Sequence, residues 1–192
     1  FRGSCAMTTE AVESLPMLAS ERLRLRELRN GDAAALLVVY GDPLAMRYWS
    51  GASWAGIAQA QEHLQRAHRD MESGGVLPWA IADLATDGLI GTVTLFKLDR
   101  DHRRAEIGYV LGSAHWGKGL ASEALRLALH HAFDALQLER IEADTDPRNA
   151  PSRRMLERLG FAQEGTLRKR WFVNDEWCDT TFYGLLREDF RG

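Results

Sequence analysis

The stretch GSAHWGKGLASEAL, residues Gly112 to Leu125, decides the fold, because in it a glycine-rich turn runs directly into an apolar helix. Backbone N–H groups in the first turn of a helix have no intrahelical acceptor and lie at the positive end of the helix dipole. Gly117 and Gly119 let a bulky anion approach these groups, and Lys118 adds a positive charge nearby. The turn therefore predicts a site for a phosphorylated ligand, such as a pyrophosphate.

The same stretch nearly matches a nucleotide-binding P-loop, counted from Gly112 to Gly117 and Lys118. A P-loop requires Ser or Thr directly after its lysine as a Mg²⁺ ligand, and Gly119 takes that place here. The strands before the turn are joined by loops too short for parallel crossovers. A nucleoside triphosphatase is therefore the least favoured alternative. On the motif alone, a glycine turn that merely begins a surface helix stays open.

Outward from this stretch, strand and helix patterns alternate along the chain. Helical patterns cover residues 32–42, with Asp32 as the expected N-cap, and residues 57–75, 120–136 and 149–159. Strand patterns cover residues 21–28, 78–84, 89–99, 105–111, 140–146, 166–173 and 176–186. Antiparallel strands followed by a β-α-β-α section predict an α/β (α+β) fold: a mixed, mostly antiparallel central sheet with helices on both faces.

Length and composition limit the classes of protein to which this chain can belong. The 192 residues suit one domain, and the net charge of −3 offers no field that favours nucleic acid. No apolar run approaches the roughly 18 residues that cross a bilayer, so no membrane contact is expected. Residues 1–6, FRGSCA, are interpreted as a cloning remnant before Met7, which leaves residues 7–192 as the domain. In this interpretation Cys5 is foreign and Cys178 is the one natural cysteine. A single cysteine is compatible with a reducing cytoplasm.

Four motifs occur in order along the second half of the chain: AEIGY (105–109), WGKGLASEAL (116–125), N-x-x-S-x-x-x-L-E-x-x-G-F (149–161) and EGTLR (164–168). This combination resembles the GNAT superfamily of acetyl-CoA-dependent N-acetyltransferases. Within it, the sequence is similar to the RimJ/RimL-type branch, which includes ribosomal-protein N-terminal acetyltransferases. The resemblance extends from Ser20 to the C-terminus and is strongest between Ala105 and Gly165.

The resemblance implies a geometry for the cosubstrate acetyl-CoA, with no metal. A strand carrying Tyr109, Val110 and Leu111 would pair its backbone with the pantetheine arm. The amides of the turn would hold the pyrophosphate; these residues are Trp116, Gly117, Lys118, Gly119, Leu120 and Ala121. Trp116 stands where the general family pattern has Arg or Gln. Asn149 resembles the family residue that contacts pantetheine, and it equally suits a plain N-cap before Pro151.

Acetyl transfer requires a base for the amine, a donor for the oxyanion and help for the leaving thiolate. The resemblance gives the base to Glu106, although a strand carboxylate paired with a neighbouring arginine is the alternative. A backbone N–H near Val110 would stabilise the oxyanion. Many family members carry a tyrosine as general acid where this chain has Leu156, and Ser152 resembles the serine proposed instead in the RimL-like branch. A capping role for Ser152 stays open.

The acceptor is a primary amine, and a protein N-terminal α-amine is favoured. At pH 7 an α-amine with a pKa near 8 is about one-tenth neutral, whereas a lysine amine is far below 1% neutral. Four aromatic residues are candidates to line the acceptor pocket, with core packing as the alternative: Trp49, Trp54, Trp171 and Tyr183. Acetylation of an antibiotic or polyamine, a non-catalytic acyl-CoA-binding regulator, and a homodimer all remain open.

Overall fold

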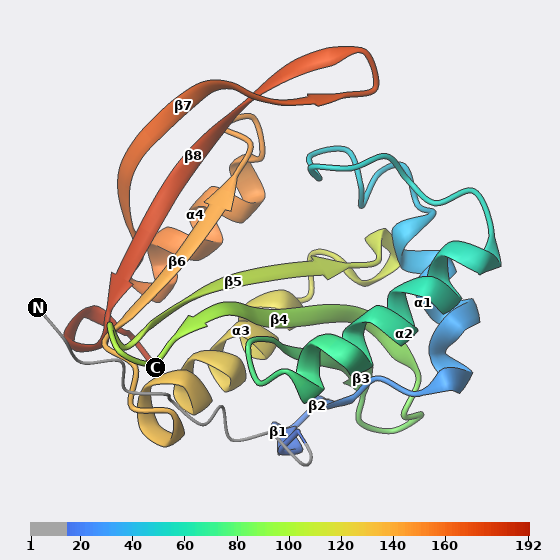
Figure 1. Ribbon diagram of the computed structural model, residues 1–192, viewed down its shortest axis with the longest axis horizontal. Helices are drawn as coiled ribbons and strands as arrows, with labels where there is room; N and C mark the ends of the chain where they lie inside the picture. Colours follow the sequence, from blue (N-terminus) through green and yellow to red (C-terminus); the bar gives the residue numbers. More distant parts are fainter. Residues whose placement is uncertain (1–14) are drawn as a thin grey trace, which may run out of the picture.

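The computed structural model describes residues 15–192, so the expected cloning remnant at residues 1–6, with Cys5, lies outside the described residues. An eight-stranded sheet forms the centre, in the order β1-β2-β3-β4-β5-β6-β8-β7 (Figure 1). The strands are β1 (Leu18–Ala19), β2 (Leu23–Glu27), β3 (Leu77–Asp83), β4 (Leu89–Asp99), β5 (Arg104–Leu111), β6 (Arg140–Thr145), β7 (Ala162–Val173) and β8 (Glu176–Leu186). All neighbours pair antiparallel except β5 and β6, which confirms the predicted mixed, mostly antiparallel sheet.

Helices cover both faces of the sheet, as predicted. They are α1 (Ala33–Tyr40), α2 (Ile57–Glu72), α3 (Leu120–His130) and α4 (Ala150–Leu159). On one face, α3 and α4 pack into the larger core through residues such as Leu125 and Leu156. On the other face, α1 and α2 form a smaller core that includes Leu36, Leu64 and Val110. Among the described residues, none of these helices is long and apolar enough to span a bilayer.

Among the local differences from the sequence prediction, two concern how helices begin and end. The α-helix α3 ends at His130, and His131–Ala135 form a π-helical turn where the apolar pattern predicted an α-helix to Leu136. Asp32 does not cap α1 with its side chain. Its carboxylate instead pairs with the buried Arg26 at 2.8 Å and accepts the N–H of Arg29 at 2.8 Å. Because the buried guanidinium of Arg26 needs a charged partner, the Asp32 carboxylate is not available to cap α1.

The parallel pairing of β5 with β6 is short. It runs only from Arg104 and Arg140 to Glu106 and Glu142. β5 then continues to Leu111 and β6 to Thr145 without a ladder between them, and the two strands diverge in Figure 1. We call these segments, residues 107–111 of β5 and 143–145 of β6, the strand split. The split leaves one edge of β5 available for hydrogen bonds with an extended ligand.

Candidate functional site

The edge of β5 presents backbone groups to the strand split at alternate residues. Gly112 donates its N–H to Ile90 O at 3.0 Å, toward β4. Because amides alternate along a strand, the N–H of Val110 also faces β4, and those of Tyr109 and Leu111 face the split. Tyr109 and Leu111 thus direct amides to the place where a pantetheine arm is expected. The side chain of Val110 packs into the smaller core.

The glycine turn after β5 allows close approach to its backbone. Gly117 and Gly119 both have a φ of +76°, a conformation that strains residues with a side chain. A Cβ at Gly117 would meet no atom within 4 Å, and one at Gly119 would meet only Arg22 Nη2 at 3.8 Å. Leu120, which begins α3, is buried, and Ala121 is half-buried. The space above the turn is therefore open to an anion at the helix N-terminus, which fits a pyrophosphate.

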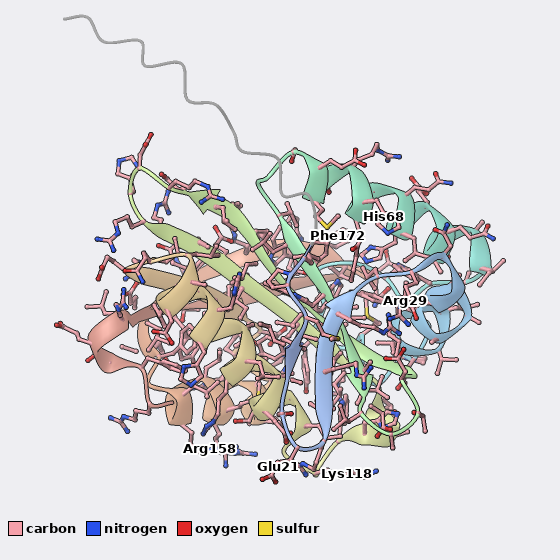
Figure 2. The ribbon with its side chains drawn as sticks, turned by 90° about the horizontal axis from the view of Figure 1, so that it is seen from below. Glu21, Arg29, His68, Lys118, Arg158 and Phe172 are labelled. Atoms are coloured by element: carbon pink, nitrogen blue, oxygen red, sulfur yellow. The ribbon has the colours of Figure 1, made fainter. Side chains whose placement is uncertain are left out.

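Arg22, in the turn between β1 and β2, fixes this helix N-terminus. Its Nη1 donates to Lys118 O at 3.0 Å, and its Nε donates to the Glu123 carboxylate at 2.8 Å. The hydroxyl of Ser20 also donates to Glu123, at 2.6 Å. Figure 2 shows Lys118, of the glycine turn, at the lower edge of the molecule beside Glu21, which is in the β1–β2 turn with Arg22. The negative charge of Glu123, in the first turn of α3, interacts favourably with the positive end of the helix dipole. The hydrogen bonds of Arg22 hold the backbone of the glycine turn in place.

The indole of Trp116 has an internal partner. Its Nε1 donates to Leu111 O at 2.8 Å, although half of the residue surface is exposed, at 50%. This bond ties the glycine turn back to the end of β5. Trp116 is therefore a support for the turn, and its one side-chain N–H is used within the chain.

Three carboxylates lie on the α1/α2 face of the sheet at the split. Glu106 is in register with Glu142, and Asp144 follows two residues later on the same face. Glu106 Oε1 accepts from Lys97 Nζ at 2.7 Å. Desolvation and the negative charge of Glu106 raise the pKa of Asp144, while Arg170 and Lys97 oppose this. The sequence alone did not link Asp144 to Glu106, because the link depends on the register of two strands far apart in the chain.

Tyr109 and Ser152 meet on the opposite, α3/α4 face. Their hydroxyl groups are hydrogen-bonded, and burial raises the pKa of Tyr109. Asn149 accepts the N–H of Ser152 at 3.3 Å, which confirms its predicted N-cap role. Leu156, at the position of the family tyrosine, is 0% exposed within the larger core. This position therefore supplies no proton donor, and Ser152 is the hydroxyl of α4 nearest to Tyr109 in the hydrogen-bond network.

The four aromatic residues predicted to line an acceptor pocket lie in three different surroundings. Trp54 stacks on Tyr40 with a centroid distance of 4.3 Å, and Trp49 meets the same ring edge-on at 5.9 Å. Trp171 is 39% exposed on β7. Tyr183 is 1% exposed in the larger core, and its hydroxyl accepts from Arg153 at 3.0 Å. Only Trp49 and Trp54 come together, as a wall against the smaller core.

Arg148 connects three segments beyond the split, and the sequence did not single it out. It pairs with Asp146 at 2.7 Å and with Glu176, at the start of β8, at 2.5 Å. Its guanidinium also lies 6.0 Å from the ring centroid of Tyr48, in the segment between α1 and α2. The loop before α4, the β7–β8 hairpin and the α1–α2 segment are thus held to one another. Partners up to 100 residues away carry no local signal in the sequence.

His63 is the third ring of the Tyr40–Trp54 cluster, with its centroid 5.3 Å from that of Trp54. Burial, and then the charge of Arg66, lower its pKa from 6.5 to about 4. Between these two pKa values the unfolded chain binds more protons than the folded chain, so the free energy of unfolding falls as the pH falls.

We expect the wild type to lose about 1–2 kcal/mol more free energy of unfolding than His63→Phe between pH 7 and pH 5. Urea titrations at both pH values measure this, and equal losses would contradict it.

No group of three or more His, Cys, Asp and Glu side chains among residues 15–192 is arranged as a metal site. The groups that the structure gathers at the split are instead hydroxyls, carboxylates and backbone amides. They suit binding of an extended, phosphorylated ligand on the β5 edge and proton transfer on both faces of the sheet.

Comparison with known proteins agrees with this geometry. The family model of the acetyltransferase (GNAT) domain matches residues 22–162. The N-acetyltransferase p20 of Bacillus licheniformis is 35% identical over 91% of this chain and 98% of its own length. RimJ of Mycobacterium smegmatis, in complex with CoA-disulfide, has a TM-score of 0.78 and 28% identity over 93% of this chain and 89% of that one. A spermidine N-acetyltransferase of Vibrio cholerae, in complex with CoA and spermine, has a TM-score of 0.78 and 25% identity over 88% and 98%.

The family model covers most of the chain, and the matched region contains the glycine turn, the strand split and the whole of α4. The sheet order and the helices on both faces are also shared with solved acetyltransferases, one with a TM-score of 0.82 over 91% of this chain and 99% of that one. The sequence motifs, the fold and the relatives thus lead to one conclusion: the chain belongs to the GNAT family of N-acetyltransferases.

Proposed function

We propose that this enzyme transfers the acetyl group of acetyl-CoA to the α-amine of a protein N-terminus, in the manner of the RimJ/RimL-type branch. The observation that carries the proposal is the strand split next to the glycine turn: a free strand edge and a helix N-terminus, side by side, suit pantetheine and pyrophosphate respectively. When bound, acetyl-CoA supplies the activated thioester. The proposal includes a reducing, cytoplasmic setting, with which the free thiol of Cys178 is compatible.

In this proposal the cosubstrate is held mainly by backbone groups. The amides of Tyr109 and Leu111 face the pantetheine, and those of residues 117–121 face the pyrophosphate. Trp116 secures the turn through its bond to Leu111 O at 2.8 Å. Asn149 orders the start of α4, and with it Ser152, through the N-cap. An amide of β5 that faces the split is also the natural oxyanion donor, since it is a fixed dipole at the reacting centre.

The proton-handling groups then lie on opposite faces of the sheet. Glu106, on the α1/α2 face, takes the proton that the amine loses, directly or through water. Ser152, on the α3/α4 face, donates a hydrogen bond to the departing sulfur. The acceptor therefore approaches from the α1/α2 side, where Trp49 and Trp54 form a wall, and the thiolate leaves on the other side. This separation keeps the carboxylate of Glu106 from accepting the hydrogen bond that Ser152 donates to the sulfur.

The charges at the split favour a singly charged amine over a polyamine. Two of the three carboxylates there are ion-paired: Glu106 with Lys97 at 2.7 Å, and Glu142 with Arg140 at 2.8 Å and Arg104 at 3.6 Å. Asp144 is not ion-paired; desolvation and the charge of Glu106 raise its pKa, against the charges of Arg170 and Lys97. A polycation gains most where several carboxylates are unpaired. The paired carboxylates support the N-terminal α-amine, although spermidine acetyltransferases are among the relatives.

Three acceptors test the proposal: a short peptide with a free N-terminus, the same peptide with a blocked N-terminus and a free lysine, and spermidine. Release of free CoA thiol from acetyl-CoA is followed for each acceptor between pH 7 and pH 9. We expect the free N-terminus to give the highest kcat/KM at pH 7, with a rate that levels off above pH 8 as its amine becomes neutral. Faster turnover of spermidine at pH 7 would overturn the assigned acceptor and leave the polyamine alternative.

A further inference from the structure

One side-chain hydrogen bond of the candidate site joins strand β5 to helix α4. The hydroxyl of Tyr109, on β5, is bonded to the hydroxyl of Ser152, in the first turn of α4. The two residues are 43 positions apart in the chain and lie beside the split, where the β5–β6 ladder has ended. Tyr109 was expected to serve only through its backbone, so its side chain has no part in the proposed function.

The chemistry of the two hydroxyls gives this bond a direction. A phenol, with an ordinary pKa near 10, is a stronger hydrogen-bond donor than an aliphatic alcohol, so Tyr109 donates and Ser152 accepts. The helix start makes no demand on the Ser152 hydroxyl, because Asn149 already caps the Ser152 N–H. With its oxygen occupied by Tyr109, Ser152 keeps its own proton for another acceptor, and a chain of two hydroxyls polarises its terminal O–H.

We propose that Tyr109 is a positioning residue, whose hydroxyl orients the Ser152 hydroxyl toward the sulfur of acetyl-CoA; this rests on the proposed function. Leu156 leaves no tyrosine on α4 to donate a proton to the sulfur, and Tyr109 does not replace it as an acid: it acts only on Ser152, through their hydrogen bond. The burial that raises the pKa of Tyr109 keeps the phenol protonated, so it remains a donor throughout the reaction.

The step balances without an additional reactant. The amine nitrogen forms a bond to the acetyl carbon, and the C–S bond breaks with its electron pair left on sulfur. The nitrogen loses its proton to Glu106, which returns it to solvent. Ser152 stabilises the sulfur anion by a hydrogen bond and does not give up its proton, and the thiolate takes a proton from water on release. Tyr109 and Ser152 end the cycle in the protonation states in which they began.

The test compares kcat, KM and the dissociation constant for acetyl-CoA in the wild type, Tyr109→Phe, Ser152→Ala and the double variant, using the peptide acceptor. We expect about a 20-fold loss of kcat in Tyr109→Phe, and about 100-fold in Ser152→Ala, with acetyl-CoA binding within twofold of wild type. Because Tyr109 acts only through Ser152, the double variant should match Ser152→Ala alone.

The matched control is Tyr40→Phe. Tyr40 also has a buried hydroxyl bonded to a partner hydroxyl, Thr92 Oγ1 at 2.8 Å, but on the other face of the sheet. It should keep the wild-type kcat, and a melting curve on each variant shows the cost of a lost tyrosine hydroxyl. If Tyr109→Phe is poorly folded, Ser152→Thr tests the same bond from its other end: it retains the hydroxyl and should recover most of the kcat that Ser152→Ala loses.

Five results would overturn the inference. An unchanged kcat in Tyr109→Phe, or weaker acetyl-CoA binding with kcat retained, would leave Tyr109 with a structural role only. A further 20-fold loss on adding Tyr109→Phe to Ser152→Ala would mean that Tyr109 acts independently of Ser152. A Ser152→Thr variant as slow as Ser152→Ala would show that the hydroxyl is not what matters. A wild type that binds acetyl-CoA but acetylates no amine would instead reject the proposed function, and the inference with it.

Discussion

Replacing Glu106 by Gln should lower kcat/KM for acetyl transfer by about 10³-fold while acetyl-CoA still binds. The glutamine keeps the shape of the side chain but cannot accept the proton of the attacking amine, and general-base assistance is typically worth 10²–10⁴-fold. Lys97 would lose its partner at 2.7 Å as well. That pair is partly exposed, so its loss should cost well under about 1 kcal/mol of stability. Steady-state kinetics with the peptide acceptor, beside acetyl-CoA titration, separate the two effects.

Glu142→Gln is the matched control. Glu142 lies in register with Glu106 on the neighbouring strand and pairs with Arg140 at 2.8 Å, so it is a carboxylate of the same face with a similar ion pair. We expect this variant to retain the wild-type kcat/KM within a factor of three or so. Equal losses in both variants would mean that Glu106 contributes only to the local charge, and the base would then have to be sought elsewhere, with Asp144 of the same face as the next carboxylate to replace.

Gly119→Val should weaken acetyl-CoA binding by about 100-fold. Gly119 has a φ of +76°, which a β-branched residue does not adopt without strain, so the start of α3 must shift. Hydrogen bonds to a charged group are worth about 1.5–3 kcal/mol each, and loss of one or two amides from the pyrophosphate gives a change of that size. Titration calorimetry with acetyl-CoA measures the effect directly.

The control for this change is Gly31→Val. Gly31 is an exposed glycine without a positive φ, and a Cβ there would meet no atom within 4 Å. It should leave the dissociation constant for acetyl-CoA unchanged. Should Gly119→Val bind acetyl-CoA as tightly as the wild type, the pyrophosphate does not lie on the glycine turn, and the role assigned to residues 117–121 is wrong.

Much of the fold was readable in the sequence because its signals are local. The glycine turn, the apolar face of α3 and the N-cap at Asn149 each depend on residues within one or two turns of one another. The strand patterns also gave the mixed sheet, since short connections force antiparallel pairing. The π-helical turn at His131–Ala135 could not be predicted, because the spacing of its apolar residues is the same as that of a continuing α-helix.

The arrangement of the candidate site was less accessible, because it depends on contacts between distant residues. The sequence named Tyr109 and Ser152 separately, but their bond needs the parallel register of β5 and β6 and the packing of α4. Tyr183 was a candidate to line the acceptor pocket, but it is buried and its hydroxyl has an internal hydrogen-bond partner; the indole N–H of Trp116 likewise has one, which the sequence did not indicate. An aromatic residue with a polar group satisfies that group wherever it is buried, and sequence patterns do not say where that is.

The most direct test is a crystal structure of the protein with CoA bound. We expect the pyrophosphate oxygens within hydrogen-bond distance of the backbone amides of residues 117–121, the pantetheine arm along residues 109–111 of β5, and the sulfur next to the Ser152 hydroxyl. CoA bound away from the strand split, or bound there with its pyrophosphate off the glycine turn, would contradict the site described above.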